Sequence, residues 1–229
     1  MGLILSIETA ISVCSVAIHE NGYLRGSLEL HQDNVHSQKL MPVIESLLGQ
    51  VGVKTDDLEA IAVSAGPGSY TGLRIGVSTA KGFAYANDIP LIAVDTLDAL
   101  AYRLHQIVEP KDFIIPMIDA RRMEVYQKVL DGEMNEQSAL EPLVIDGTSF
   151  LEFLNRGKVF FLGDAVIKVQ NEIRHPNARF VTWVNSAISV GELAYKKFVE
   201  KEFVNVAYFE PNYLKEFRVI TSKKNPLLS

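Results

Sequence analysis

Hydrophobic residues along the first third of the chain follow two periods. Three short apolar runs, each typical of a strand, cover residues 3–8, 13–19 and 23–30. Asn21-Gly22 lies between the second and third runs and favours a tight hairpin, because both residues tolerate positive φ. Over residues 36–51 the hydrophobic positions instead recur every three or four residues, which predicts an amphipathic helix that stops at Gly52. We therefore expect three antiparallel strands and then a helix.

The same two patterns alternate in the residues that follow. They predict a strand at 60–64, a helix at 71–87, a strand at 91–95 and a helix at 97–108. The resulting order, βββαβαβα, favours a mixed sheet with helices on both faces, because strands joined through helices run parallel. This is the order of the ribonuclease H-like fold, the unit repeated in actin-like and sugar-kinase-like proteins. The analogy concerns the fold alone, since one fold serves many functions.

A second lobe is predicted to begin near Glu109-Pro110. It is expected to contain strands at 113–119 and 124–130, further strand or helix segments at 150–155, 159–163 and 165–172, and a helix at 190–202. This half is too short to repeat the first in full. We therefore predict an α/β protein of two ribonuclease H-like lobes that pack together, an N-terminal lobe at 1–108 and a shortened lobe at 109–229.

Composition and charge narrow the possible partners and compartments. The formal net charge is −6, and an acidic chain repels a phosphate backbone, so tight unaided binding to nucleic acid is not expected. Cys14 is the only cysteine, which rules out an internal disulfide and fits a reducing compartment. The first residues resemble a strand and not a signal peptide, and no apolar run approaches the ~20 residues of a membrane span. We expect a cytoplasmic protein that does not contact membranes.

The stretch from Gly66 to Gly72 is rich in glycine and precedes a predicted helix. The Walker pattern fails because Leu73 stands where it requires lysine, and the dinucleotide pattern fails because Thr71 stands at its last glycine. A helix N-terminus still offers N–H groups to an anion, so phosphate contact remains an alternative. The favoured interpretation is a tight strand-to-helix turn with Ser69 or Thr71 as the N-cap.

The predicted helix at 71–87 has an apolar face of roughly 200°, which is wider than packing on one sheet requires. Gly72, Gly76 and Ala80 recur at four-residue spacing and form a smooth ridge that another backbone could approach closely. Glycine destabilises a helix interior, and close packing is one way to offset this effect. We expect the ridge to contact a partner protein; the alternative is contact with only the chain's own sheet and first helix.

Three carboxylates stand at the ends of predicted strands: Glu8, Asp95 and Asp119. Carboxylates in this position can hold Mg²⁺ and a nucleotide, as in sugar kinases. The alternative is loop polarity or helix capping, and Asp95 suits capping because a predicted helix follows it. The turn after the first strand, residues 9–12, contains no glycine, which argues against nucleotide binding by this half alone.

Asp119 also opens an unusual segment in which two arginines lie between carboxylates. Asp119, Arg121 and Glu124 are candidates for an anion or partner contact, and an internally ion-paired turn is the alternative. No histidine pair has metal-ligand spacing, and the cysteine lies in a predicted buried strand, where packing is its expected role. We therefore predict no catalytic residue, no cofactor site and no metal site.

Four stretches of this sequence resemble the TsaB family, also called YeaZ: ILSIETA at 4–10, AGPGSYTGLRIGVSTAKGFA at 65–84, IDARRMEVY at 118–126 and EPNYLK at 210–215. Lys215 stands where the family commonly has arginine. The resemblance implies a non-catalytic relative of the enzyme TsaD, which with the ATPase TsaE installs threonylcarbamoyl on an adenosine beside the tRNA anticodon. TsaD carries two metal-binding histidines where Thr96 and Leu100 stand here, so the resemblance implies that this metal site is absent.

The resemblance also implies that the helices at 36–51 and 71–87 form a docking face for TsaD and for a second copy of the chain. On this basis the partner interface is predicted to contain Leu40, Ile44, Leu47, Gly72, Leu73, Gly76, Ala80 and Phe83. Arginine in place of Gly76 is expected to abolish TsaD binding while leaving the chain folded.

The main hypothesis is a scaffold subunit without catalytic activity or a cofactor of its own. It would form a heterodimer with TsaD, admit TsaE through that complex, meet tRNA only indirectly and form a homodimer when alone. The alternative is a nucleotide-binding enzyme of the actin-like fold, such as a small-molecule kinase, because of the three strand-end carboxylates. Micromolar binding of Mg-ATP to the isolated chain would favour that alternative.

Overall fold

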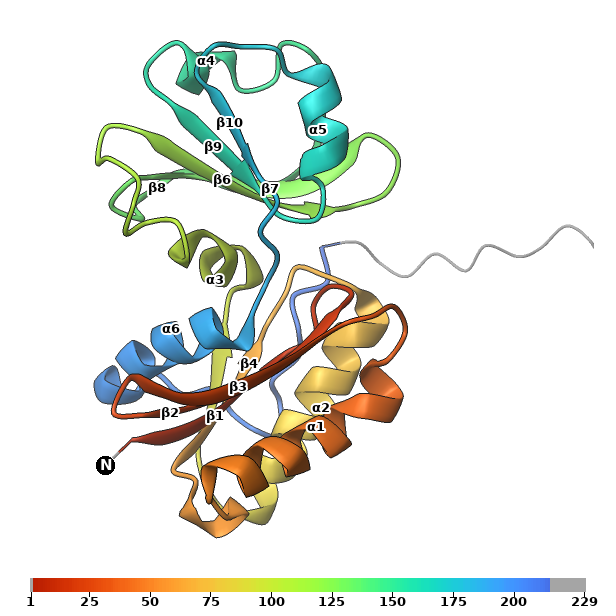
Figure 1. Cartoon of the computed structure of the whole chain (residues 1–229), viewed down its shortest axis with the longest axis vertical. Helices are drawn as coiled ribbons and strands as arrows, with labels where there is room; N and C mark the ends of the chain where they lie inside the picture. Colours follow the sequence, from red (N-terminus) through yellow and green to blue (C-terminus); the bar gives the residue numbers. More distant parts are fainter. Residues whose placement is uncertain (1, 215–229) are drawn as a thin grey trace, which may run out of the picture.

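The computed structural model describes residues 2–214 as two lobes, each built on one five-stranded sheet (Figure 1). The strands of the first lobe are β1 (Leu3–Glu8), β2 (Val13–Glu20), β3 (Tyr23–His31), β4 (Ala60–Ser64) and β5 (Leu91–Val94). Their order across the sheet is β3-β2-β1-β4-β5. β1, β2 and β3 pair antiparallel, whereas β4 and β5 join parallel, so the mixed sheet expected from the sequence is confirmed.

Helices cover both faces of the first sheet (Figure 1). They are α1 (His36–Val51) and α2 (Tyr70–Ala86) on one face and α6 (Ala187–Glu200) on the other. Because side chains alternate along a strand, Leu5 and Ile7 of β1 pack against α1 and α2. Ile4 points to the opposite face and packs with Val190 and Ala194 of α6. The alternation along β1 therefore gives the lobe a core on each side of the sheet.

The predicted order βββαβαβα is confirmed for the first lobe, with one added 3-10 turn at Thr55–Asp57 and a shorter last helix. α3 covers Thr96–Tyr102, and not the expected 97–108. Leu104 and Val108 follow the helix and pack in one cluster with Ile114 of the second sheet. The residues after α3 therefore contribute apolar side chains to the junction of the lobes without extending the helix.

The second lobe repeats the sheet of the first. Its strands are β6 (Phe113–Asp119), β7 (Glu124–Asp131), β8 (Glu136–Val144), β9 (Val159–Leu162) and β10 (Ala178–Val181). They lie in the order β8-β7-β6-β9-β10, with the same antiparallel and parallel pairings as in the first lobe. The shortening affects the helices: up to residue 214, those that pack in this lobe are α4 (Leu151–Leu154) and α5 (Val166–Glu172). The sequence analysis did not predict β8 or β10. β8 is an edge strand that contains a proline, and β10 has only four residues, so neither has a clear strand pattern.

The last helix corrects the division of the chain at residue 108. α6 was expected at 190–202 within the second lobe, but it begins at Ala187, after the N-cap Ser186, and packs on the first sheet. Without α6, the face of the first sheet that carries Ile4 would lose its apolar cover. Residues 109–229 therefore do not form one lobe, since the chain returns to the first lobe after β10.

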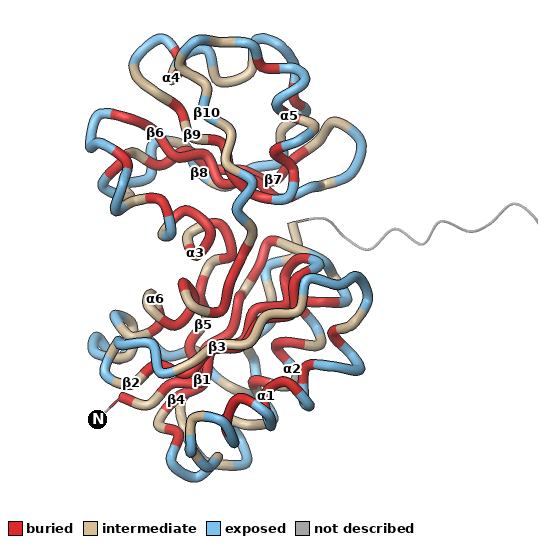
Figure 2. Tube along the Cα trace, viewed as in Figure 1, coloured by how far each residue is buried: buried red, intermediate tan, exposed pale blue. Residues whose placement is uncertain are grey.

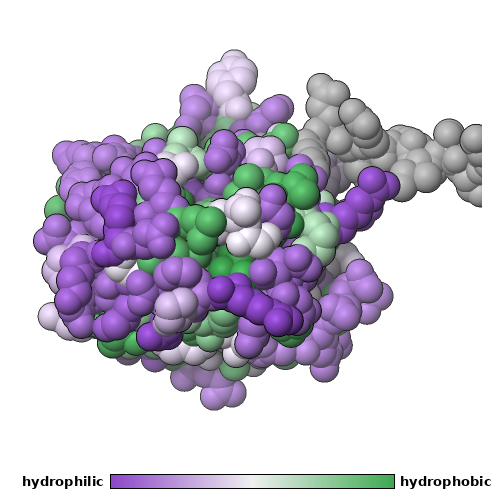
Figure 3. All heavy atoms as spheres, turned by 90° about the horizontal axis from the view of Figure 1, so that it is seen from above, coloured by the Kyte–Doolittle hydropathy of each residue, from purple (hydrophilic) through white to green (hydrophobic). Residues whose placement is uncertain are grey.

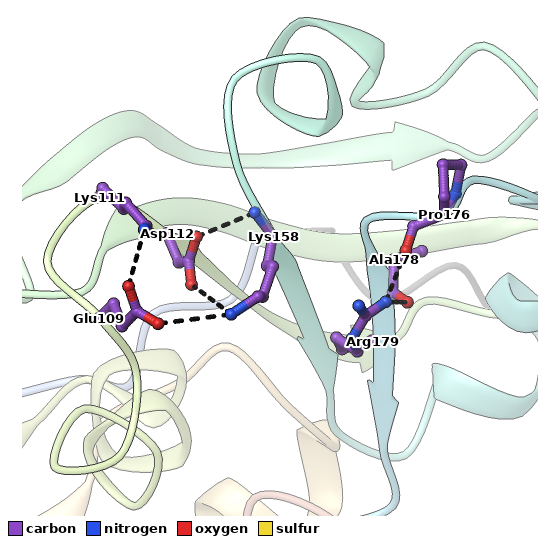
Figure 4. A network of polar contacts seen from close by, with 7 residues as sticks. All are labelled: Glu109, Lys111, Asp112, Lys158, Pro176, Ala178 and Arg179. Carbon is purple, nitrogen blue, oxygen red and sulfur yellow. Dashed lines mark hydrogen bonds and ion pairs between the residues drawn. The ribbon is translucent and has the colours of Figure 1, made fainter.

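The lobes meet through α3, which lies between the two sheets in Figure 1 and is largely buried in Figure 2. The segment that leads into β6 is fixed to the second lobe by ion pairs (Figure 4). Glu109 contacts Lys111 at 2.9 Å and Lys158 at 3.4 Å, and the buried carboxylate of Asp112 accepts a hydrogen bond from Lys158 N at 3.0 Å. These contacts define where the second lobe begins.

The end of the molecule formed by the second lobe is mostly hydrophilic, with hydrophobic surface between the polar side chains (Figure 3). Leu151 of α4 and Ile167 of α5 are exposed apolar side chains of this lobe. Among residues 2–214, no helix has the length and apolar character that a membrane crossing requires.

Candidate functional site

The glycine-rich loop packs against the turn between β1 and β2. Ser69 N donates a hydrogen bond to Ala10 O at 2.6 Å, and Thr9 Oγ1 donates one to Gly72 O at 2.8 Å. Gly72 and Gly76 of α2 face Thr9, and a Cβ at either position would overlap atoms of Thr9. The glycines are therefore required by the close approach of the β1–β2 turn. Ser69 is the N-cap, as expected, and accepts a hydrogen bond from Gly72 N.

This contact corrects the predicted partner interface. The small-residue ridge of α2 faces the chain's own first lobe and not a partner. Seven of the eight predicted residues are buried inside the chain: Leu40, Ile44, Leu47, Gly72, Leu73, Gly76 and Ala80. Only Phe83 is partly exposed. The buried residues hold α1 and α2 on the sheet. Since the side chain of a Gly76→Arg variant would collide with Thr9, we now expect this variant to disturb the fold of the first lobe as well.

The C-terminal segment at 204–213 explains why the apolar face of α2 is so wide. Lys81 of α2 donates hydrogen bonds to the carbonyl oxygens of Ala207 and Phe209, both at 3.1 Å. Val206 and Phe209 are partly buried against the same core cluster as α2. The chain therefore covers a second side of the helix itself. Lys215, the last residue of the matching EPNYLK stretch, lies outside the described residues.

The outward faces of α1 and α2 remain exposed and lie beside each other (Figure 2). Met41 is 51% exposed on α1, and Tyr85 is 84% exposed on α2. The exposed polar neighbours on the two helices include Lys39, Glu45, Arg74 and Ser78. Between α2 and the C-terminal segment runs a groove lined by Arg74, Ser78, Phe209 and Tyr213, among others. This surface mixes aromatic, aliphatic and arginine side chains, a composition that is typical of protein contacts.

Glu8 is fully buried, and the chain's own groups surround its carboxyl. Its Oε1 accepts a hydrogen bond from Ala10 N at 2.5 Å, and its Oε2 accepts one from the Ser64 hydroxyl. Burial raises the pKa of Glu8 from 4.5 to about 7, although these hydrogen bonds and one from Asn185 act in the opposite direction. The carboxyl has no exposed surface with which to contact a nucleotide.

Asp95 caps α3, which was the alternative to a ligand role. Its Oδ1 accepts hydrogen bonds from Leu97 N at 2.9 Å and Asp98 N at 3.0 Å. Lys128 of β7 also lies 3.3 Å from Asp95 and 2.5 Å from Asp98, and its own side chain is almost fully buried. Burial raises the pKa of Asp95, and the nearby ammonium of Lys128 counteracts this. The ion pairs join α3 to the second lobe.

The two positions that match the TsaD histidines are also used internally. Thr96 Oγ1 accepts a hydrogen bond from Gly66 N at 3.0 Å, and Thr96 O accepts one from Asn185 Nδ2 at 2.9 Å. Leu100 is fully buried in the apolar cluster between the lobes. Within residues 2–214, no three side chains of His, Cys, Asp or Glu lie close enough together to hold a metal ion.

Asp119 lies at the turn between β6 and β7, which is ion-paired through a lysine. Lys168 Nζ of α5 contacts Asp119 Oδ1 at 2.7 Å and donates hydrogen bonds to the carbonyl oxygens of Arg122 at 3.0 Å and Glu124 at 2.7 Å. Arg121 N donates to Asp119 Oδ1 at 2.6 Å. Both arginine side chains are exposed. Asp119, Arg121 and Glu124 therefore do share one turn, whereas Glu8, Asp95 and Asp119 have separate partners and do not form one site.

The sequence analysis missed both lysines of these contacts. Lys128 lies in the apolar run EVYQKVL, and a charge within such a run is a signal for a buried ion pair. Lys168 belongs to a seven-residue helix without a comparable pattern, so only the packing of α5 beside the turn reveals its role.

Comparisons with known proteins agree with the resemblance seen in the sequence. The family model of TsaD, tRNA N6-adenosine threonylcarbamoyltransferase, matches residues 30–218. The tRNA threonylcarbamoyladenosine biosynthesis protein TsaB of Haemophilus influenzae is 28% identical over 97% of both chains. TsaB of Escherichia coli is 36% identical, over 54% of this chain and 52% of that protein.

A solved structure extends this similarity to the three-dimensional fold. YeaZ from Pseudomonas aeruginosa superposes with a TM-score of 0.81 and 28% sequence identity, over 93% of this chain and all of that one. The similarity therefore covers both lobes, including the second half, where few sequence motifs were recognised.

Proposed function

Because the chain belongs to the TsaB (YeaZ) family and takes part in tRNA threonylcarbamoyladenosine biosynthesis, we propose that it is a non-catalytic scaffold that binds TsaD. The family model that it matches describes the transferase, so this chain and TsaD are related over most of its length. A chain that has the fold of the enzyme but not its metal-binding histidines can still offer the enzyme a surface of matching shape.

The use of its polar side chains supports the non-catalytic part of the proposal. The carboxylate of Glu8 accepts hydrogen bonds from Ala10 N and the Ser64 hydroxyl. The carboxylate of Asp95 caps helix α3 and forms an ion pair with Lys128. Leu100 fills the junction between the lobes. The groups from which a nucleotide or metal site would be built in this fold therefore contribute to internal structure.

The outward faces of α1 and α2 are the observation that carries the docking proposal. Met41 and Tyr85 expose apolar surface on two neighbouring helices. The opposite faces of both helices pack on the first sheet through one buried hydrophobic cluster. Such a rigid platform can receive the equivalent helices of a related chain with little loss of conformational entropy. TsaD is the proposed occupant, and a second copy of this chain would use the same face when TsaD is absent.

The wider assembly follows from this docking. TsaE would engage the complex and not the isolated scaffold, and tRNA would be met indirectly, because the acidic chain repels phosphate. The single buried Cys14 fits the reducing environment of the cytoplasm, where we propose that the protein acts.

Size-exclusion chromatography with light scattering tests the docking face directly. The wild-type chain should form a homodimer that gives way to a heterodimer when its cognate TsaD is added. Met41→Asp combined with Tyr85→Asp should prevent both assemblies, because buried charges at an interface lack partners. Val199→Asp is the matched control, since Val199 is a similarly exposed apolar residue on α6, which covers the opposite face of the first sheet.

Each outcome has a defined meaning for the scaffold. Loss of both assemblies in the double variant alone, with unchanged circular dichroism, supports the docking face. Undiminished TsaD binding by the double variant would contradict the proposed docking face. Absence of TsaD binding by the wild-type chain would contradict the scaffold function altogether.

A further inference from the structure

The turn between β6 and β7, residues 120–123, places two arginines in a backbone conformation that favours glycine. Arg121 has φ 71° and Arg122 has φ 51°. Tight hairpin turns with two such residues usually carry Asn-Gly or Gly-Gly, because other side chains are strained there. Glycine would relieve the strain at both positions. Arginine at both therefore indicates that the side chains serve a purpose that outweighs the strain.

Contacts with helix α5 and with Asp164 hold the backbone of this turn in place. Lys168 of α5 binds the carboxylate of Asp119 and the carbonyl oxygens of Arg122 and Glu124, at 2.7 to 3.0 Å. Asp119 in turn accepts the N–H of Arg121, and Asp119 N donates to Asp164 Oδ1 at 2.8 Å. The backbone is held in place from within, while both arginine side chains lie at the surface.

The surroundings of the turn favour a protein as the partner. Val144 of the edge strand β8 lies opposite Glu124 and is 66% exposed. Met123 and Ala120 are partly buried at the border of two apolar clusters, so the turn is bounded by apolar side chains. Arginine next to exposed apolar surface is the composition enriched at the energetically important positions of protein interfaces.

The local charges argue against an extended polyanion such as RNA. The turn and its support contain as many acidic residues (Asp119, Asp164 and Glu124) as cations (Arg121, Arg122 and Lys168), and Lys168 contacts the Asp119 carboxylate directly. The whole chain carries a formal charge of −6. Binding to a phosphate backbone depends on many cations that act together, whereas a guanidinium can bind one carboxylate through two parallel hydrogen bonds.

We propose that Arg121 and Arg122 bind acidic side chains of a protein partner in the threonylcarbamoyl-transfer complex. This rests on the proposed function, since the partner is sought within that complex. The turn and α5 belong to the second lobe, whereas α1 and α2 belong to the first (Figure 1). The contact therefore adds a second anchor that is separate from the docking face.

The test replaces both arginines by glycine, which removes the guanidinium groups and relieves the backbone strain at once. The full-length Arg121→Gly/Arg122→Gly variant should melt at the same or a higher temperature than the wild type. Its affinity for cognate TsaD, or that of its TsaD complex for cognate TsaE, should fall about tenfold or more, since hydrogen bonds between charged groups are lost. Asn34→Gly is the matched control, because Asn34 is exposed with φ 57° and its replacement relieves strain without removing a cation.

Isothermal titration calorimetry with TsaD, TsaE and a tRNA transcript as separate probes decides the matter. Weaker binding to either protein by the arginine variant, and not by Asn34→Gly, supports the contact. Unchanged binding to both proteins overturns it, and so does a loss confined to tRNA, which would indicate phosphate recognition. Met41→Asp/Tyr85→Asp, measured in parallel, reports on the docking face alone, so failure of one surface is distinguishable from failure of the other.

Discussion

Thr9 at the end of β1 and Gly72 in the first turn of α2 are joined by a hydrogen bond of 2.8 Å, from the threonine hydroxyl to the glycine carbonyl oxygen. The two residues are 63 positions apart in the sequence, and three strands, helix α1, one 3-10 turn and the glycine-rich loop lie between them. This bond shows what the small-residue ridge is for: it lets the β1–β2 turn approach α2 closely. The ridge that suggested a partner therefore belongs to the fold of the first lobe.

Substitution of Gly76 by alanine should destabilise the chain by about 1–3 kcal/mol, because the added methyl group has no room beside Thr9. Gly82→Ala on the same helix is the control: nothing lies within 4 Å of its Cβ position, so alanine should stabilise by about 0.5–1 kcal/mol. Urea denaturation of both variants measures the difference. Equal effects at the two positions would mean that Thr9 does not limit the approach of α2.

Glu8 should make the stability of the chain depend on pH. Its pKa is about 7 in the folded state against 4.5 ordinarily, so the folded chain holds an extra proton between these values. The contribution of Glu8 to the free energy of unfolding is therefore greatest below pH 4.5 and falls by about 3 kcal/mol as the pH rises through 7.

Glu8→Gln removes this titration while keeping a hydrogen-bonding side chain of the same size. Relative to the wild type, the variant should gain stability at pH 8 and gain little at pH 5, as measured by chemical denaturation at both values. Glu45→Gln, an exposed position on α1, should show no such difference. A stability difference that is independent of pH would argue that Glu8 is ionised throughout.

His19 should show the opposite dependence. Burial without hydrogen-bond partners in the described residues lowers the pKa of its imidazole from 6.5 to about 4. The unfolded chain therefore binds a proton first as the pH falls, so the stability due to His19 is present above 6.5 and is lost toward pH 4. NMR titration should show His19 essentially neutral at pH 6, with its protonation occurring only as the pH falls toward 4.

Lys128 should be important for the junction of the lobes. Lys128→Met leaves Asp95 and Asp98 without their cation and should destabilise the chain by about 2–3 kcal/mol, because both carboxylates remain partly buried. Lys111→Met removes an exposed ion pair with Glu109 and should have a much smaller effect, because solvent screens the two charges. Thermal unfolding followed by calorimetry compares the two. Similar losses for both variants would mean that the buried pair contributes no more than a surface one.

The sequence by itself determined the strands of the first lobe and its helices α1 and α2, because each has a clear hydrophobic period and a recognisable end. Helix α1 has the predicted bounds, and β1, β4 and β6 also agree residue for residue. The motif IDARRMEVY likewise identified a turn in which Asp119, Arg121 and Glu124 lie together. Local periodicity carries this information because residues of one element face the same neighbours.

Only the tertiary structure decided which surface each apolar face meets. The sequence pattern of α2 indicates a wide apolar face, but it does not indicate what covers that face. In the structure, Thr9 covers one side of the helix and the segment at 204–213 covers another, where a partner protein had been expected. The position of α6 on the first sheet, and the roles of Lys128 and Lys168, depend likewise on contacts between residues far apart in the chain. A periodic pattern measures how much of an element is buried, whereas the identity of what buries it depends on how distant segments pack.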